Sequence, residues 1–173
     1  MVTVTLSWVL TSLLGMMPYL LGGFIPNVSE AFFESMSGFS TTGASILTDI
    51  EALPRSILLW RSITQWIGGI GIIVFIVALV PFAGESASVV YDHETTGITH
   101  DRFVPRIGVM AKWIMFIYII LSILCVLLLW AGPFTLYEAV CHAATCISTG
   151  GFSIYNQSIA EVNSDYIIIV LTI

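Results

Sequence analysis

The chain has 173 residues, of which 57% are hydrophobic and only 9% are charged. In soluble domains about a quarter of the residues are charged. A chain with so few charged residues could not cover the surface of a soluble domain with polar groups. The net charge of −6, from 5 basic and 11 acidic residues, excludes the basic surface that binds nucleic acid. Uncharged runs at 1–29, 62–84 and 113–137 each exceed the about 20 residues that cross a bilayer as a helix. We therefore expect an all-α, multi-pass integral membrane protein that lies in the lipid bilayer.

Four membrane helices are predicted in chain order. The first three cover roughly 2–24, 57–82 and 107–130. A fourth begins near Asp165 and is only about eight residues long, or about 12 Å, when the sequence ends. We therefore expect the sequence to be a fragment of a longer chain.

The two connections at 25–56 and 131–164 resemble each other at an offset of 108 positions. Over the 20 positions from 27 to 46, seven residues are identical at that offset. Each connection begins like a capping box, with Asn27-x-x-Glu30 in one and Thr135-x-x-Glu138 in the other. Such an internal repeat indicates that the fold is built from repeated units.

Each connection continues with about ten small and apolar residues, which as a helix would span about 15 Å, half a bilayer. Each then ends in hydroxyl residues and a glycine, Gly43 or Gly151. Glycine after a short helix indicates a tight turn, since glycine adopts positive φ freely. We therefore predict one complete helix–loop–helix unit at 1–82 and a truncated second unit at 107–173.

The topology follows from counting crossings. Each complete unit crosses twice, so both glycine turns lie on the same face of the membrane and the linker at 83–106 lies on the other. The linker and its flank hold three of the five basic residues, which predicts a cytoplasmic location. The outer connections are rich in acidic residues, which would concentrate cations there.

Irregular backbone at membrane depth is tolerated where protein buries it or where it lines an aqueous path. The C-terminal end of a short helix carries a partial negative charge. Carbonyl oxygens just beyond that end can replace the water shell of a cation. The repeated element therefore has the physical outline of a cation filter. The alternative is two surface loops that share only their turn chemistry.

Three segments resemble the Trk/Ktr/HKT superfamily of potassium transporters. Residues 34–45 (ESMSGFSTTGAS) and 142–153 (HAATCISTGGFS) are similar to its first two pore loops. Residues 60–72 (WRSITQWIGGIGI) are similar to the helix after the first loop in the bacterial Trk branch. The resemblance implies a potassium-channel-like fold with four such units in one chain, of which this sequence holds the front half.

The resemblance also implies a function and a site. The expected function is potassium uptake across the bacterial inner membrane, with K⁺ as the transported ion, Na⁺ as a second candidate ion and no bound cofactor. The implied filter residues are Thr41, Thr42, Gly43, Thr149, Gly150 and Gly151. The implied partners are a cytoplasmic ring of nucleotide-binding subunits and a second full-length chain in a homodimer.

The helix after the first loop carries further candidates. Arg61 and Gln65 lie one turn apart near its outer end. A charge in a membrane segment is usually paired, and Glu34 is the favoured partner, but an arginine reaching to the interface is an equal alternative. Three small residues, Gly68, Gly69 and Gly71, predict close helix packing or a gating hinge.

Two other functions fit parts of the sequence. An intramembrane serine enzyme would use Ser40 or Ser148 as nucleophile and His142 as base. The repeat duplicates the serines, but His142 aligns with Glu34, which favours a pore over an enzyme. A cation-coupled secondary transporter with broken helices at the midplane is mechanistically close to the pore.

Overall fold

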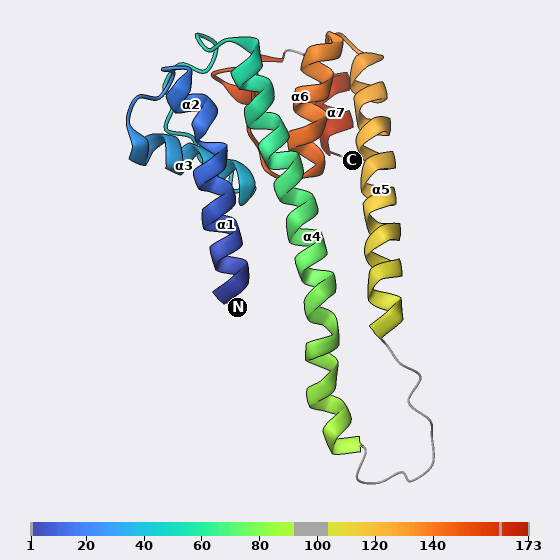
Figure 1. Cartoon of the computed structure of the whole chain (residues 1–173). Helices are drawn as coiled ribbons and strands as arrows, with labels where there is room; N and C mark the ends of the chain where they lie inside the picture. The colour runs from blue at the N-terminus through green and yellow to red at the C-terminus, as the bar shows by residue number, and fades with distance from the viewer. Residues whose placement is uncertain (1, 92–103, 163, 173) are drawn as a thin grey trace.

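The computed structural model describes residues 2–91, 104–162 and 164–172, and every regular element in these ranges is helical (Figure 1). The helices, in chain order, are α1 (Val2–Gly15), α2 (Met17–Leu21), α3 (Val28–Phe39), α4 (Arg55–Tyr91), α5 (Val104–Trp130), α6 (Leu136–Ile147), the 3-10 helix Ser158–Glu161 and α7 (Asp165–Thr172). The start of α7 and the span of α5 agree with the prediction, whereas the 3-10 helix was not predicted.

The predicted first helix is two helices. α1 ends at Gly15, and α2 begins at Met17 with Pro18 in its first turn. Proline is favoured there because its missing N–H would have no helical partner in any case. Gly23 follows α2 with a φ of +69°, which ends the helical path before α3.

The predicted end of the second helix, at residue 82, was wrong. α4 runs for 37 residues to Tyr91, about 55 Å, which exceeds the about 30 Å hydrocarbon core of a bilayer. Polar residues do not end a helix that has left the lipid, so polarity alone gave the wrong boundary. Of the predicted linker at 83–106, its first nine residues belong to α4 and its last three to α5, and 92–103 lie outside the described residues.

Among the described residues, one helical segment, Val109–Trp130 of α5, has the length and apolar character to cross a membrane. Most of its large side chains are exposed, as expected of a surface that contacts lipid. Thr5–Leu21 forms a shorter apolar segment.

α4 packs against both short helices, α3 and α6, which lie near the same end of the long helices α4 and α5 (Figure 1). One apolar cluster joins α2, α3 and the start of α4, and a second joins α5, α6 and α7. A third cluster joins α4 to the second repeat through Leu58, Cys141 and Ile154. The first residues of α4 are therefore one part of the contact between the two repeats.

Candidate functional site

Both short helices begin with a side-chain cap, and the capping box that the sequence predicts for both is formed only in α6. Asn27 accepts a hydrogen bond from Ser29 N at 3.0 Å, and its amide contacts Glu30. Thr135 and Glu138 form a reciprocal capping box, with Thr135 N donating to Glu138 Oε2 at 2.7 Å. α3 and α6 each contain 12 residues, about 18 Å, so both are half-membrane in length as predicted.

The two helices also end in the same way. At the end of α3, Thr41 N donates to Gly38 O and Thr42 N donates to Ser37 O, both at 3.0 Å. The equivalent bonds from Thr149 N to Cys146 O and from Gly150 N to Thr145 O, both 2.9 Å, end α6. Paired bonds of this kind satisfy helix-terminal carbonyls and need a left-handed residue between the helix and the exiting chain.

The left-handed residues that end the helices are threonines. Thr41 and Thr149 both have a φ of 55°, and two residues later Gly43 and Gly151 have φ of 76° and 79°. The positive φ of the two glycines was predicted, whereas that of the threonines was not. Left-handed backbone is unfavourable for a β-branched residue, so surrounding contacts must hold both threonines there.

The two loops approach each other at Gly43 and Gly150. A Cβ built on Gly43 would lie 2.0 Å from Gly150 O, so no side chain fits at this position. Gly150 in turn lies against Gln65, because a Cβ there would lie 2.4 Å from Gln65 Cδ. A Cβ on Gly151 would meet nothing within 4 Å. The structure thus brings together three residues that were singled out in the sequence, namely Gly43, Gly150 and Gln65.

The predicted pair between Arg61 and Glu34 is confirmed. Arg61 Nε and Nη2 both lie 2.9 Å from Glu34 Oε1, and the side chains are 1% and 0% exposed. Glu34 also accepts hydrogen bonds from Ser45 Oγ and Ile46 N, just after the first loop. The carboxylate therefore has partners on both sides, as a buried charge requires.

Arg61 and Gln65 also reach the second loop. Arg61 Nη1 donates to Ser153 O at 3.1 Å, and its guanidinium lies 4.2 Å from the centre of the Phe152 ring. Gln65 Oε1 accepts from Phe152 N at 3.1 Å. The sequence marked these residues as candidates but gave no sign that they contact the second repeat.

The glycines of α4 lie at close helix contacts. A Cβ on Gly68 would lie 2.0 Å from Phe39 O, and one on Gly69 would lie 2.6 Å from Tyr118 Oη. At Gly71 the nearest atom would be a carbon of the Trp8 ring at 3.4 Å, an ordinary contact. Gly68 and Gly69 thus permit close packing.

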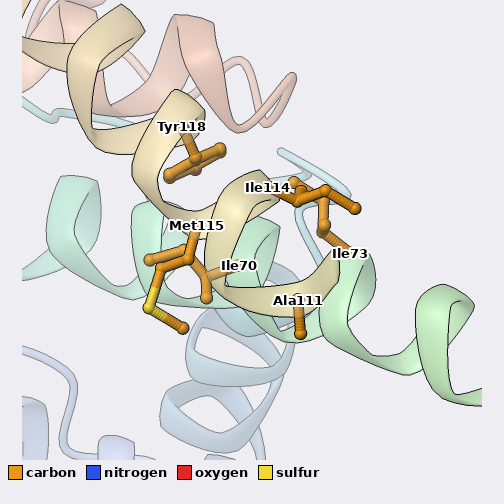
Figure 2. A pocket seen from close by; sticks show the side chains of 6 residues that line it. All are labelled: Ile70, Ile73, Ala111, Ile114, Met115 and Tyr118. Atoms are coloured by element: carbon orange, nitrogen blue, oxygen red, sulfur yellow. The ribbon is translucent and has the colours of Figure 1, made fainter. Parts of the chain in front are cut away.

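Just after Gly68 and Gly69 along α4, this helix and α5 face each other across a small apolar cleft. Figure 2 shows its lining side chains, Ile70, Ile73, Ala111, Ile114, Met115 and Tyr118. The cleft has no room for a water molecule, so it is a packing defect between two helices and not a ligand site.

The serine–histidine pair of the enzyme alternative is not formed. Ser148 Oγ donates to Thr145 O at 3.1 Å, and Ser40 Oγ contacts Thr42 Oγ1 at 2.8 Å. The His142 ring instead contacts Glu138 O through Nδ1 and Ser153 Oγ through Nε2. Neither suggested nucleophile therefore has His142 as its base, and activation of the serine requires that contact.

A family model described as "TrkH: Cation transport protein" matches residues 1–173. The Trk system potassium uptake protein TrkH of Escherichia coli K12 is 37% identical over 98% of this chain and 36% of the relative. An uncharacterized cation transporter of Methanocaldococcus jannaschii is 39% identical over 91% of this chain and 33% of the relative. The crystal structure of the potassium transporter TrkH from Vibrio parahaemolyticus matches with a TM-score of 0.80 and 34% identity, over 96% of this chain and 32% of that one. The chain thus spans about a third of the length of the relatives that it matches.

Proposed function

The chain belongs to the TrkH family of cation transport proteins, and we propose that it forms part of a potassium-uptake protein whose ion path is lined by the loops after α3 and α6. Relatives named as potassium uptake proteins match nearly the whole chain, which supports potassium as the transported ion. The proposed filter residues are those singled out in the sequence, at 41–43 and 149–151.

The observation that carries this proposal is the matched backbone of the two loops. In each, positive φ occurs at a threonine and again two residues later at a glycine. Alternating backbone handedness gathers successive N–H groups on one side of the chain, which leaves the carbonyls for the other side. A row of carbonyls at the negative end of a short helix is suited to a dehydrated cation.

The contact between the loops supports the same conclusion. Gly43 and Gly150 approach so closely that the two loops must border one shared space or bury each other. The open surroundings of Gly151 support a position for that residue at the edge of such a space. We propose that two further units of the full-length protein complete the ring, with the linker at 83–106 on the cytoplasmic face of a bacterial inner membrane.

The proposed partners follow from the same assignment. They are K⁺, with Na⁺ as the competing ion, a cytoplasmic ring of nucleotide-binding subunits, and a second full-length chain in a homodimer. K⁺ is held by backbone carbonyls in this proposal, so no other cofactor is required.

The test compares Gly151→Ser with Gly23→Ser in the full-length protein. Both glycines have positive φ, +79° and +69°, and a Cβ on either would meet nothing within 4 Å, so the backbone strain of about 1–2 kcal/mol is matched. Rubidium uptake with sodium competition is measured in cells that lack other potassium uptake. We expect sodium to compete better in Gly151→Ser and unchanged in Gly23→Ser.

Gly43→Ser should shift the competition in the same direction and also lower the amount of folded protein, because its side chain would meet Gly150 O as well as strain the backbone. If sodium competes equally with wild type, Gly23→Ser and Gly151→Ser, the loop after α6 does not line the ion path and the proposed function is wrong.

A further inference from the structure

We infer that Arg61 and Gln65 of α4 are positioning residues that fix the second loop against the first, and that this brace sets the preference for potassium over sodium. The inference rests on the proposed function, because it concerns the same two loops. It goes beyond the buried ion pair, since the contacts that carry it are those from the first repeat to the second.

The guanidinium of Arg61 joins equivalent points of the two loops. Its Nη2 donates to Ser45 Oγ at 3.2 Å, and its Nη1 donates to Ser153 O at 3.1 Å. Ser45 and Ser153 are 108 residues apart, the offset of the internal repeat, and each follows its loop glycine by two positions. One rigid, planar side chain therefore fixes the distance between matched positions of the two loops.

Gln65 holds the second loop one turn further along α4. Its Oε1 accepts from Phe152 N at 3.1 Å, and its side chain lies directly against Gly150. Phe152 also covers the guanidinium of Arg61 with its ring. The two α4 residues thus contact the second loop on both sides of Gly151, whose carbonyl is among the proposed ion ligands.

The brace belongs to the junction between repeats and not to the fold of one repeat. α4 begins at Arg55 and α7 at Asp165, so the seventh residue of α4, Arg61, matches the seventh residue of α7, Leu171, which carries no charge. α6 nevertheless has the same length, cap and terminal turn as α3. A buried ion pair adds little stability over an apolar pair of similar size, whereas it can impose one register.

A difference in ion preference follows from the placement of these bonds. Replacing the water shell of potassium requires carbonyl oxygens on several sides at once. If Ser153 O and Phe152 N lose their partners on α4, the loop at Gly151 can shift relative to Gly43 while α6 keeps its own cap. Transport would then continue with a weaker distinction between the two ions.

The experiment uses Arg61→Lys in the full-length protein, with Arg55→Lys on the same helix as the matched control. Lysine keeps a cation beside Glu34 but has no planar fork that reaches Glu34, Ser45 and Ser153 O together. Rubidium uptake is measured over a range of sodium concentrations. We expect the sodium inhibition constant to fall about fivefold in Arg61→Lys, the scale of one net hydrogen bond, and to stay at the wild-type value in Arg55→Lys.

Gln65→Met is the second variant, because it removes the acceptor for Phe152 N without changing any charge. It should shift sodium inhibition in the same direction. The inhibition constant does not depend on the amount of protein, so a lower yield in either variant does not obscure the result. Wild-type sodium inhibition in both variants, whatever their yield, overturns the inference.

The inference and the proposed function fail in different ways. If Gly151→Ser differs from Gly23→Ser while Arg61→Lys and Gln65→Met match wild type, the loop lines the ion path but α4 does not position it. If Gly151→Ser also matches Gly23→Ser, the proposed function itself is wrong.

Discussion

Replacing Arg61 by alanine should destabilise the full-length protein much more than the same replacement of Arg55. Arg61 is 1% exposed and lies against the fully buried carboxylate of Glu34. Its removal leaves that charge without its cation, which in buried pairs costs about 3–5 kcal/mol. Arg55 is exposed and has a single aromatic contact, with Tyr137 at 5.6 Å. Such a contact contributes about 0.5–1 kcal/mol.

The assay is denaturant-induced unfolding of the purified full-length protein in detergent, for Arg61→Ala, Arg55→Ala, Glu34→Ala and the double variant of Arg61 and Glu34. We expect the double variant to lose less free energy of unfolding than the two single losses added together, because it leaves no unpaired buried charge. Equal losses for Arg61→Ala and Arg55→Ala, or strictly additive losses in the double variant, would show that the pair is not energetically coupled.

Two further predictions concern packing and capping. Gly68→Ala should sharply reduce the folded yield because its Cβ would lie 2.0 Å from Phe39 O, whereas Gly71→Ala should be tolerated because its nearest contact is 3.4 Å; size-exclusion profiles of both full-length variants in detergent test this, and equal yields would contradict it. Thr135→Ala should cost about 1 kcal/mol of unfolding free energy through loss of the α6 cap, and Thr135→Ser should restore it; a Ser variant as unstable as the Ala variant would argue against the cap.

The features that the sequence predicted well are those with local causes. The capping box of α6 depends on residues three positions apart, and the positive φ of Gly43 and Gly151 depends on the residue type itself. The pairing of Arg61 with Glu34 follows from the cost of an isolated charge in lipid. Each of these signals is contained within one repeat.

The features that it did not predict depend on contacts between repeats. The left-handed Thr41 and Thr149 are an exception, because they lie in local helix-end turns, but they contradict the preference of β-branched residues and so were not predicted. The bonds from Arg61 and Gln65 to the second loop join residues about 90 positions apart. No periodicity or motif reports such a pairing, because helix packing decides it.

The two repeats make the same contact with different residues, and Arg61 explains why. Glu34 accepts a hydrogen bond from Ser45 Oγ at 3.0 Å, and at the matched positions His142 Nε2 lies 3.4 Å from Ser153 Oγ. A carboxylate is possible in the first repeat because Arg61 lies beside it. The second repeat has the uncharged Leu171 at the position of α7 that matches Arg61, so a carboxylate at residue 142 would have no equivalent of this arginine beside it. A neutral histidine can contact Ser153 without a permanent charge. This accounts for His142 in the second repeat at the position where the first repeat has Glu34.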